Sequence, residues 1–278
     1  MVIDFHNHFY PDKIAAKAIE KLTTGANIVA YTDGTAKGLS EDLKSAGYDL
    51  GVVLPVATAP KQVEHINTSA VEVNAMYPNL LSFGAIHPDY ENYKDEILRI
   101  KELGLKGIKL HPDYQETFFD DERYLRIMDE AFKQDLIVVV HSGLDIGLPK
   151  PVHTGVEQVL NVINIFGDKA SKLVLAHTGA WAMWDEVYEK IAGKNVYIDI
   201  SFSLGATKRK SDGSDLKLLD DDLLYKICKK HGVDKVLFGT DSPWGDHKAM
   251  LEKFMTLPFT NEEQDLILYK NAKKLLKI

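Results

Sequence analysis

The sequence predicts one (β/α)8 barrel that spans residues 1–278 as a single domain. Short apolar, β-branched runs recur along the chain, and amphipathic segments with helical spacing separate them, as in an α/β fold. Runs such as 136–140 are continuously hydrophobic, which is typical of parallel strands buried on both faces. There are eight such runs and no linker or composition break between them. This number fits the closed barrel.

The predicted elements follow one another in regular order. Strands are expected at 2–6, 50–55, 81–86, 105–111, 136–141, 173–177, 196–200 and 236–240. Helices are expected at about 62–78, 91–103, 121–134, 154–167, 182–192, 219–231 and 246–256, and a last one at about 261–277 behind a Thr260/Glu263 capping box. The long connections 23–38, 143–153 and 203–217 are candidate lids or substrate walls. A doubly wound open sheet is the alternative, disfavoured because no Gly-x-Gly-x-x-Gly follows a strand.

Composition limits the partners that the protein could have. A net charge of −8 and a pI near 5.7 argue against nucleic acid or an anionic membrane surface, which leaves a small-molecule substrate. No apolar stretch approaches the roughly 20 residues of a membrane span, and no secretion signal is recognisable, so a cytoplasmic location is expected. The single cysteine, Cys228, excludes a disulfide framework and predicts a buried thiol.

Histidines gather where the predicted strands end. His6 and His8 end the first strand, and side chains two residues apart on a strand share one face. Six of the ten histidines lie at such ends, the others being His87, His111, His141 and His177. Barrel active sites form at this rim, and packing does not explain six imidazoles there, because a buried imidazole without a partner costs free energy. The remaining four, His65, His153, His231 and His247, are expected on the surface, with the rim as the alternative for His153 and His247, which follow the fifth and eighth strands.

Seven motifs along the chain carry a family resemblance. They are DFHNH at 4–8, KGIKLHP at 106–112, HSG at 141–143, HTG at 177–179, NVYID at 195–199, FGTDSP at 238–243 and NAKKLL at 271–276. The set resembles the amidohydrolase superfamily, in particular its amidohydrolase-related branch, which includes aminocarboxymuconate semialdehyde decarboxylase. It covers essentially the whole chain and is specific for the branch, but much less so for a reaction.

The resemblance implies one divalent metal ion, most often zinc, bound by His6, His8, His141 and Asp241, with Mn²⁺ or Fe²⁺ as alternatives. Three neutral imidazoles and one carboxylate suit Zn²⁺ and leave a position for water, whose pKa the metal lowers to about 7. Asp241 would also be the catalytic base, and His177 would be the acid/base residue beside the water. The resemblance also allows a homodimer.

Lys109 leaves the number of metal ions open. Some members of the superfamily carry a carboxylated lysine that bridges two metals, and His177 would then bind the second metal. The branch is usually mononuclear, so Lys109 or His111 is expected to bind a substrate carboxylate or to support the site. Asp199 and Ser201 share a strand face and could orient a ligand imidazole. Trp244 is a candidate apolar wall for the substrate.

The expected function is hydrolysis of a small amide, lactone or ester by metal-activated water. The alternative is non-oxidative decarboxylation of an unsaturated or aromatic carboxylic acid, which the branch performs with the same ligands. A decarboxylase often anchors the substrate carboxylate with an arginine, and none of the four arginines closely follows a strand end. A non-catalytic barrel is a third hypothesis, disfavoured because all five residues of the site are present.

Overall fold

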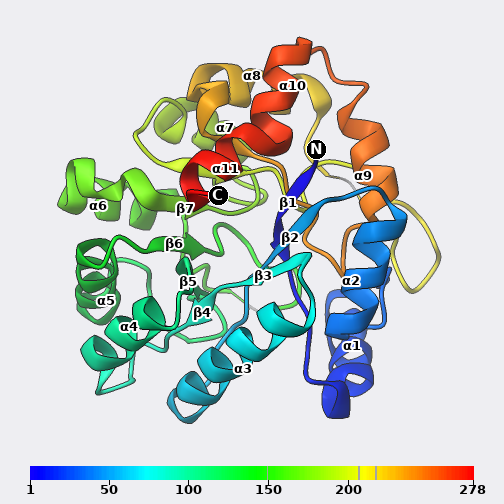
Figure 1. The fold of residues 1–278 in the computed structure, drawn as a ribbon. Helices are drawn as coiled ribbons and strands as arrows, with labels where there is room; N and C mark the ends of the chain where they lie inside the picture. The colour runs from blue at the N-terminus through cyan, green and yellow to red at the C-terminus, as the bar shows by residue number, and fades with distance from the viewer. Residues whose placement is uncertain (149, 206, 217) are drawn as a thin grey trace.

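The computed structural model describes residues 1–148, 150–205, 207–216 and 218–278. Pro149 of the connection 143–153, and Ala206 and Lys217 of 203–217, therefore lie outside the described residues. Figure 1 shows short strands at the centre of the molecule and helices around them. No helix in the described ranges is long and apolar enough to cross a membrane, and Cys228 is buried as predicted.

The strands are parallel and follow one another in chain order. They are β1 Ile3–Asn7, β2 Leu50–Val53, β3 Leu80–Ser82, β4 Gly84–Ala85, β5 Gly107–Leu110, β6 Ile137–Val140, β7 Leu173–Leu175, β8 Tyr197–Asp199 and β9 Val236–Leu237. The first three form one sheet and the other six form a second. Only Phe83 separates β3 from β4, so these two short strands occupy one position and the order runs through eight positions.

Backbone hydrogen bonds join the last strand position to the first. Phe5 N donates to Phe238 O at 2.8 Å, and Asp241 N donates to His6 O at 2.9 Å. His8 N donates to Ser242 O at 2.6 Å. The strands therefore close into the predicted (β/α)8 barrel, and the closing seam lies between β1 and the residues after β9.

The helices surround the strands. They are α1 Asp12–Ala26, α2 Ala36–Ser45, α3 Val63–Met76, α4 Tyr93–Glu102, α5 Glu122–Lys133, α6 Val156–Phe166, α7 Trp184–Glu186, α8 Asp221–His231, α9 His247–Phe254, α10 Asn261–Asp265 and α11 Asn271–Leu276. A π-helical turn, Leu266–Lys270, joins α10 to α11, and the Thr260/Glu263 capping box is present. The sequence analysis missed α1 and α2, so the first long connection is only 27–35.

Two apolar layers position the site. One layer lies between strands and helices, and the other fills the barrel with side chains such as Ile3, Phe5 and Val139. Leu275 and Leu276 of α11 belong to this inner layer, and Figure 1 shows α11 beside the start of β1. The inner layer and α11 fill the N-terminal end of the barrel, so polar side chains gather at the C-terminal ends of the strands.

Candidate metal centre

Three side chains meet at the closing seam of the barrel. His6 and His8 come from the end of β1, and Asp241 follows β9. The Nε2 atoms of His6 and His8 are 3.2 Å apart. Asp241 Oδ1 lies 3.4 Å from His6 Nε2 and 3.1 Å from His8 Nε2. Ligand atoms around a tetrahedral zinc ion, at about 2.0–2.1 Å from the metal, are about 3.3 Å from one another. The spacing therefore matches the coordination shell of a small divalent cation.

Hydrogen bonds fix which nitrogen of each imidazole carries the proton. His6 Nδ1 lies 2.9 Å from Asp199 Oδ2, and His8 Nδ1 lies 2.8 Å from the carbonyl oxygen of Leu54. Because a carboxylate and a carbonyl only accept, both Nδ1 atoms donate, and in the neutral rings each Nε2 carries a lone pair. Burial and the nearby Lys109 ammonium lower the pKa of His6 well below its usual value, which keeps the ring neutral.

The three facing atoms are therefore acceptors. Burial acts to raise the pKa of Asp241, but the contact with His8 and the surrounding imidazoles lower it below its usual value. An ionised carboxylate and two lone pairs at this distance need a cation between them. The donor set of two imidazoles and one carboxylate fits a divalent metal such as zinc, manganese or iron.

His177 and His141 extend this cluster. The His177 ring stacks on His6 with centroids 5.0 Å apart, and its Nδ1 lies 3.2 Å from the carbonyl oxygen of Ser201, to which it donates. His177 Nε2 therefore accepts, and His141 Nδ1 donates to it at 3.0 Å. Within the described residues, His141 lies outside the group formed by His6, His8 and Asp241, and its buried Nε2 has no hydrogen-bond partner.

The backbone at the site is in a strained conformation. His177, Thr178 and Asp241 have φ angles of 59°, 56° and 66°, in the left-handed region that β-branched and bulky residues rarely adopt. Such residues cost about 1–3 kcal/mol each and persist only where neighbours hold them. Asp199 Oδ1 accepts from His177 N at 3.1 Å, and His6 O accepts from Asp241 N at 2.9 Å. Strain of this kind is concentrated at functional sites.

The carboxylate of Asp199 organises both halves of the cluster, as the strand spacing predicted. One oxygen accepts from His6 Nδ1, and the other accepts from Ser201 Oγ and from the backbone N–H of Ser201 and His177. Asp199 and Ser201 are fully buried. A carboxylate behind a histidine is the usual support for a metal ligand.

A family model described as "Amidohydrolase" matches residues 3–278. The chain belongs to the amidohydrolase family. Members of this family are metal-dependent enzymes. A comparison with curated proteins gives no match.

Solved structures show the same fold as this amidohydrolase. A 2,6-dihydroxybenzoate decarboxylase from Rhizobium is 16% identical over 99% of this chain and 98% of its own, with a TM-score of 0.69. A probable 2-pyrone-4,6-dicarboxylic acid hydrolase from Acinetobacter baumannii is 15% identical over 100% and 99%, with a TM-score of 0.67. A 5-carboxyvanillate decarboxylase mutant from Novosphingobium aromaticivorans, solved with bound manganese, is 15% identical over 100% and 97%, with a TM-score of 0.68.

Lys109 of the amidohydrolase lies directly against the trio. It is 1% exposed, and its Nζ is 3.1 Å from His6 Nε2. Burial lowers the pKa of Lys109 to about 8, despite the nearby carboxylates of Asp199 and Asp241. Its position therefore agrees with a role at the site, either toward the substrate or as a carboxylated lysine.

His111 lies on the far side of His141 from His177. The His111 and His141 rings stack with centroids 4.2 Å apart and an interplanar angle of 9°, and His111 Nε2 is 3.5 Å from Asp145 Oδ2. The ligand atoms of His111, His141 and Asp145 are close enough together to be considered as a second metal site. They do not suit one, because a metal lies close to the plane of each imidazole that binds it, and two parallel stacked rings share no plane.

Two carboxylates beside His111 were missed by the sequence analysis. Asp113 is buried, and its Oδ1 accepts from His153 N at 3.1 Å and lies 3.0 Å from His153 Nδ1. Its Oδ2 has no hydrogen-bond partner and lies 3.9 Å from His141 Nε2. Burial raises the pKa of Asp145 to about 6. Both residues lie in connections after strands, where no periodic pattern marks a side chain as buried.

The three long connections of the amidohydrolase meet in one apolar group. It consists of Ile28, Trp181, Phe202 and Leu216, with Leu144, Ile146, Trp184, Leu218 and Trp244 packed against them. Trp184 Nε1 donates to the carbonyl oxygen of His177 at 3.2 Å. Trp244 therefore packs in the apolar group whose member Trp184 contacts the backbone of His177.

The histidines outside the metal centre differ in how deeply they are buried. His65 is exposed as expected, and His153 is half-buried. The expectation of surface positions was wrong for His231, which is buried with Nε2 2.9 Å from Val196 O, and for His247, which is 1% exposed. Both are tolerated inside because their ring nitrogens have partners. His87 accepts from Asp89 N at 3.1 Å and lies outside the candidate metal groups of the described residues.

Proposed function

We propose that the protein is a metal-dependent hydrolase that uses activated water to cleave a small amide, lactone or ester. The observation that carries this proposal is the set of three mutually facing acceptors, His6 Nε2, His8 Nε2 and Asp241 Oδ1, with His177 stacked against His6. One divalent metal ion, zinc in the first place, would be held by these three residues. His141, whose buried Nε2 has no hydrogen-bond partner in the described residues, is the proposed fourth ligand.

A divalent metal at this position supplies Lewis acidity, which lowers the pKa of water and polarises an ester or amide carbonyl. Asp241 would accept a proton from the attacking water, because its carboxyl, whose pKa lies below its usual value, is ionised. His177 is neutral, since burial lowers its pKa, and its Nε2 would take up this proton once it no longer accepts from His141 Nδ1. His177 then gives the proton to the leaving group.

The charges beside His111 favour hydrolysis over decarboxylation. A decarboxylase must hold a substrate carboxylate, but Asp145 lies next to His111 and Asp113 lies next to His141, and both carboxylates repel an anion there. Arg99 is paired with Glu96 of α4, and Arg123 is paired with Asp89 and Asp121 in the connections before α4 and α5. Lys109 remains as the one group proposed to bind a substrate oxygen. Two of the structural relatives described above are named decarboxylases, so decarboxylation stays the second candidate.

Metal analysis and two activity assays test the proposal. The purified protein should hold close to one equivalent of metal and should hydrolyse members of a panel of lactones, esters and amides. Aromatic carboxylic acids, assayed in parallel for CO₂ release, should not react. Asp241→Asn should lose turnover, and the matched surface variant Asp222→Asn should keep it. Metal-free protein at full purity, or CO₂ release alone, would overturn the hydrolase assignment.

A further inference from the structure

His247 is held between acceptors on both sides of its ring. It is the first residue of α9 and is 1% exposed. Its Nδ1 lies 2.6 Å from Asp42 Oδ2, and its Nε2 lies 3.0 Å from Asn7 Oδ1 and 3.1 Å from Asp4 Oδ2. Carboxylates and an amide oxygen only accept, so both ring nitrogens donate. His247 is therefore an imidazolium buried inside the molecule.

The partners of His247 on one side flank the metal ligand His6. Asp4 Oδ1 accepts from the backbone N–H groups of His6 and Thr240, each at 3.0 Å, and Asp4 Oδ2 accepts from Thr240 Oγ1 at 2.5 Å. Asn7 donates through Nδ2 to Asp4 O and Val52 O, which fixes its Oδ1 toward His247. Asp4 thus joins the strand that carries His6 to the residue that precedes Asp241.

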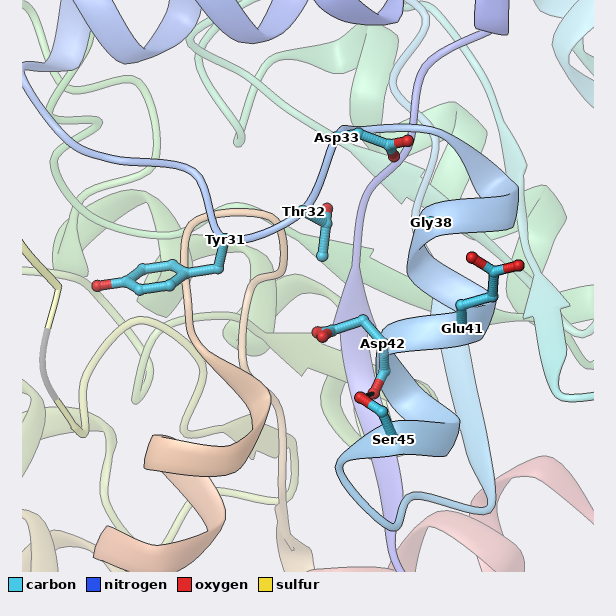
Figure 2. A pocket seen from close by; sticks show the side chains of 7 residues that line it. All are labelled: Tyr31, Thr32, Asp33, Gly38, Glu41, Asp42 and Ser45. Atoms are coloured by element: carbon cyan, nitrogen blue, oxygen red, sulfur yellow. Dashed lines mark hydrogen bonds between the residues drawn. The ribbon is translucent and has the colours of Figure 1, made fainter.

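The partner on the other side lies near the surface. Asp42 belongs to α2, and its side chain is 35% exposed on the wall of a hollow of about 310 Å³ (Figure 2). Figure 2 shows Asp33 and Glu41 on the same hollow. From the remaining elements, Tyr48 donates its hydroxyl to His247 O at 2.6 Å, and Asp246 caps α9 through Ala249 N.

We propose that His247 is a positioning residue of the metal centre, a buried cation that binds Asp4 and Asn7 from behind and keeps His6 in register with Asp241. The inference rests on the proposed function, because it assumes that His6 and Asp241 bind one metal. His247 acts through Asp4, which accepts the two backbone hydrogen bonds from His6 and Thr240. His247 itself touches neither substrate nor metal. Its single positive charge lies between two carboxylates, those of Asp4 and Asp42, so the group keeps one net negative charge.

The dissociation constant of Zn²⁺, measured by competition with a chelator, tests the proposal. His247→Gln removes the cation and should weaken Zn²⁺ binding by about tenfold or more, the usual effect of an outer partner of a metal ligand. Asp42→Asn leaves the imidazole in place at a partly exposed position and should give a smaller loss. His231→Gln is the matched control, since His231 is also buried but, among the described residues, its ring nitrogens contact only backbone atoms of Val196 and Gly193. It should keep wild-type affinity even if its stability falls.

Two further readouts separate positioning from a general structural role. The ¹⁵N chemical shifts of His247 at pH 7.5 should show two protonated ring nitrogens. Burial opposes this charge, but the hydrogen bonds to Asp4 and Asp42 raise the pKa of His247 to about 9. The difference in Zn²⁺ affinity between wild type and His247→Gln should therefore shrink as the pH rises through 9. Equal Zn²⁺ affinity of wild type and His247→Gln at pH 7.5, or a neutral His247, would overturn this inference alone. A wild-type protein that binds no metal would overturn the proposed function with it.

Discussion

His6 and Asp199 are separated by 193 residues and are joined by a buried hydrogen bond of 2.9 Å between Nδ1 and Oδ2. This contact fixes the tautomer of His6 and aims its Nε2 at His8 and Asp241. Because the other oxygen of the same carboxylate holds the backbone of His177, the proposed metal site and the proposed proton-transfer residue share one support. Changes at Asp199 should therefore affect both.

Asp199→Asn keeps the shape of the side chain but removes its charge. The amide can present only one acceptor oxygen, so either His6 or the Ser201/His177 backbone loses its partner. Metal affinity should fall by about 10–100-fold. Chelator competition measures this, with Asp222→Asn as the exposed control. Unchanged affinity would show that His6 does not need the Asp199 carboxylate at Nδ1, where Ser201 Oγ also lies at 3.0 Å.

His177→Asn should separate binding from catalysis. His177 is proposed to move a proton without binding the metal, so metal content should stay near one equivalent. The kcat value should fall by roughly 10²–10⁴-fold, the usual contribution of a general acid/base. Metal content before and after dialysis, together with kcat, checks this. A wild-type protein with two equivalents, of which the variant loses one, would favour a binuclear centre with a carboxylated Lys109.

The pH dependence of stability should carry the signature of His247. Its folded pKa of about 9 lies above the ordinary value of 6.5, so its contribution is complete below pH 6.5 and is lost as the pH rises through 9. A shift of this size corresponds to roughly 3 kcal/mol of unfolding free energy. Urea unfolding of metal-free wild type and His247→Gln at several pH values measures the difference between them.

The difference between the two proteins is the relevant quantity, because Lys109 acts in the opposite direction. Its folded pKa of about 8 lies below its ordinary value of 10.5, so the burial of its ammonium is destabilising at low pH and this penalty disappears as the pH rises toward 10.5. Lys109 is present in both proteins, so its contribution cancels in the difference between their unfolding free energies. A difference that does not change between pH 6 and 10 would contradict a charged His247.

Asp145→Asn should change the response to anions. The substitution removes a negative charge 3.5 Å from His111, so inhibition by a small carboxylate such as benzoate should become stronger, by several-fold. Inhibition constants at pH 7.5 measure this, and Asp222→Asn again serves as the control. If wild type already binds benzoate tightly and the variant does not bind it better, the argument against an acidic substrate fails.

Trp244→Ala should weaken substrate binding more than turnover. The Trp244 side chain packs in the apolar group formed by the three connections, and only its backbone N–H bonds Asp241, at the carbonyl oxygen. Loss of the partly buried indole should raise KM by about tenfold, since this corresponds to about 1.4 kcal/mol of apolar contact. Trp244→Phe should restore much of this loss. A fall in kcat at unchanged KM would instead place Trp244 in the catalytic machinery.

The sequence predicted the barrel because its strands are buried on both faces and read as continuous apolar runs. It did not predict α1, although Ala15, Ala18, Ile19 and Leu22 are apolar at helical spacing; the folded helix buries only Ala15 and Thr23. α2 was also missed, although Leu39 and Leu43 are buried at helical spacing and Thr35 caps the helix by accepting from Gly38 N.

The candidate site could be predicted where strand geometry decides it. His6, His8 and Asp241 meet because all three follow strand ends at the closing seam. Asp113 lies in a connection whose path the sequence does not fix. His247 was placed on the surface because its partners, Asp4 and Asp42, are distant in the chain. The contacts that bury a charged residue come from the tertiary structure.

The proposed metal ligands also lie on both sides of the closing seam of the barrel. His6 and His8 stand on one side of it and Asp241 on the other, next to the contact between Asp4 and Thr240, which are 236 residues apart. A cation bound from both sides would cross-link the first and last strands, and so close a loop that contains nearly the whole chain. Removal of the metal should then loosen the first and last strands before the rest, so that a chelator exposes the two ends of the chain to proteases while the middle of the barrel stays protected.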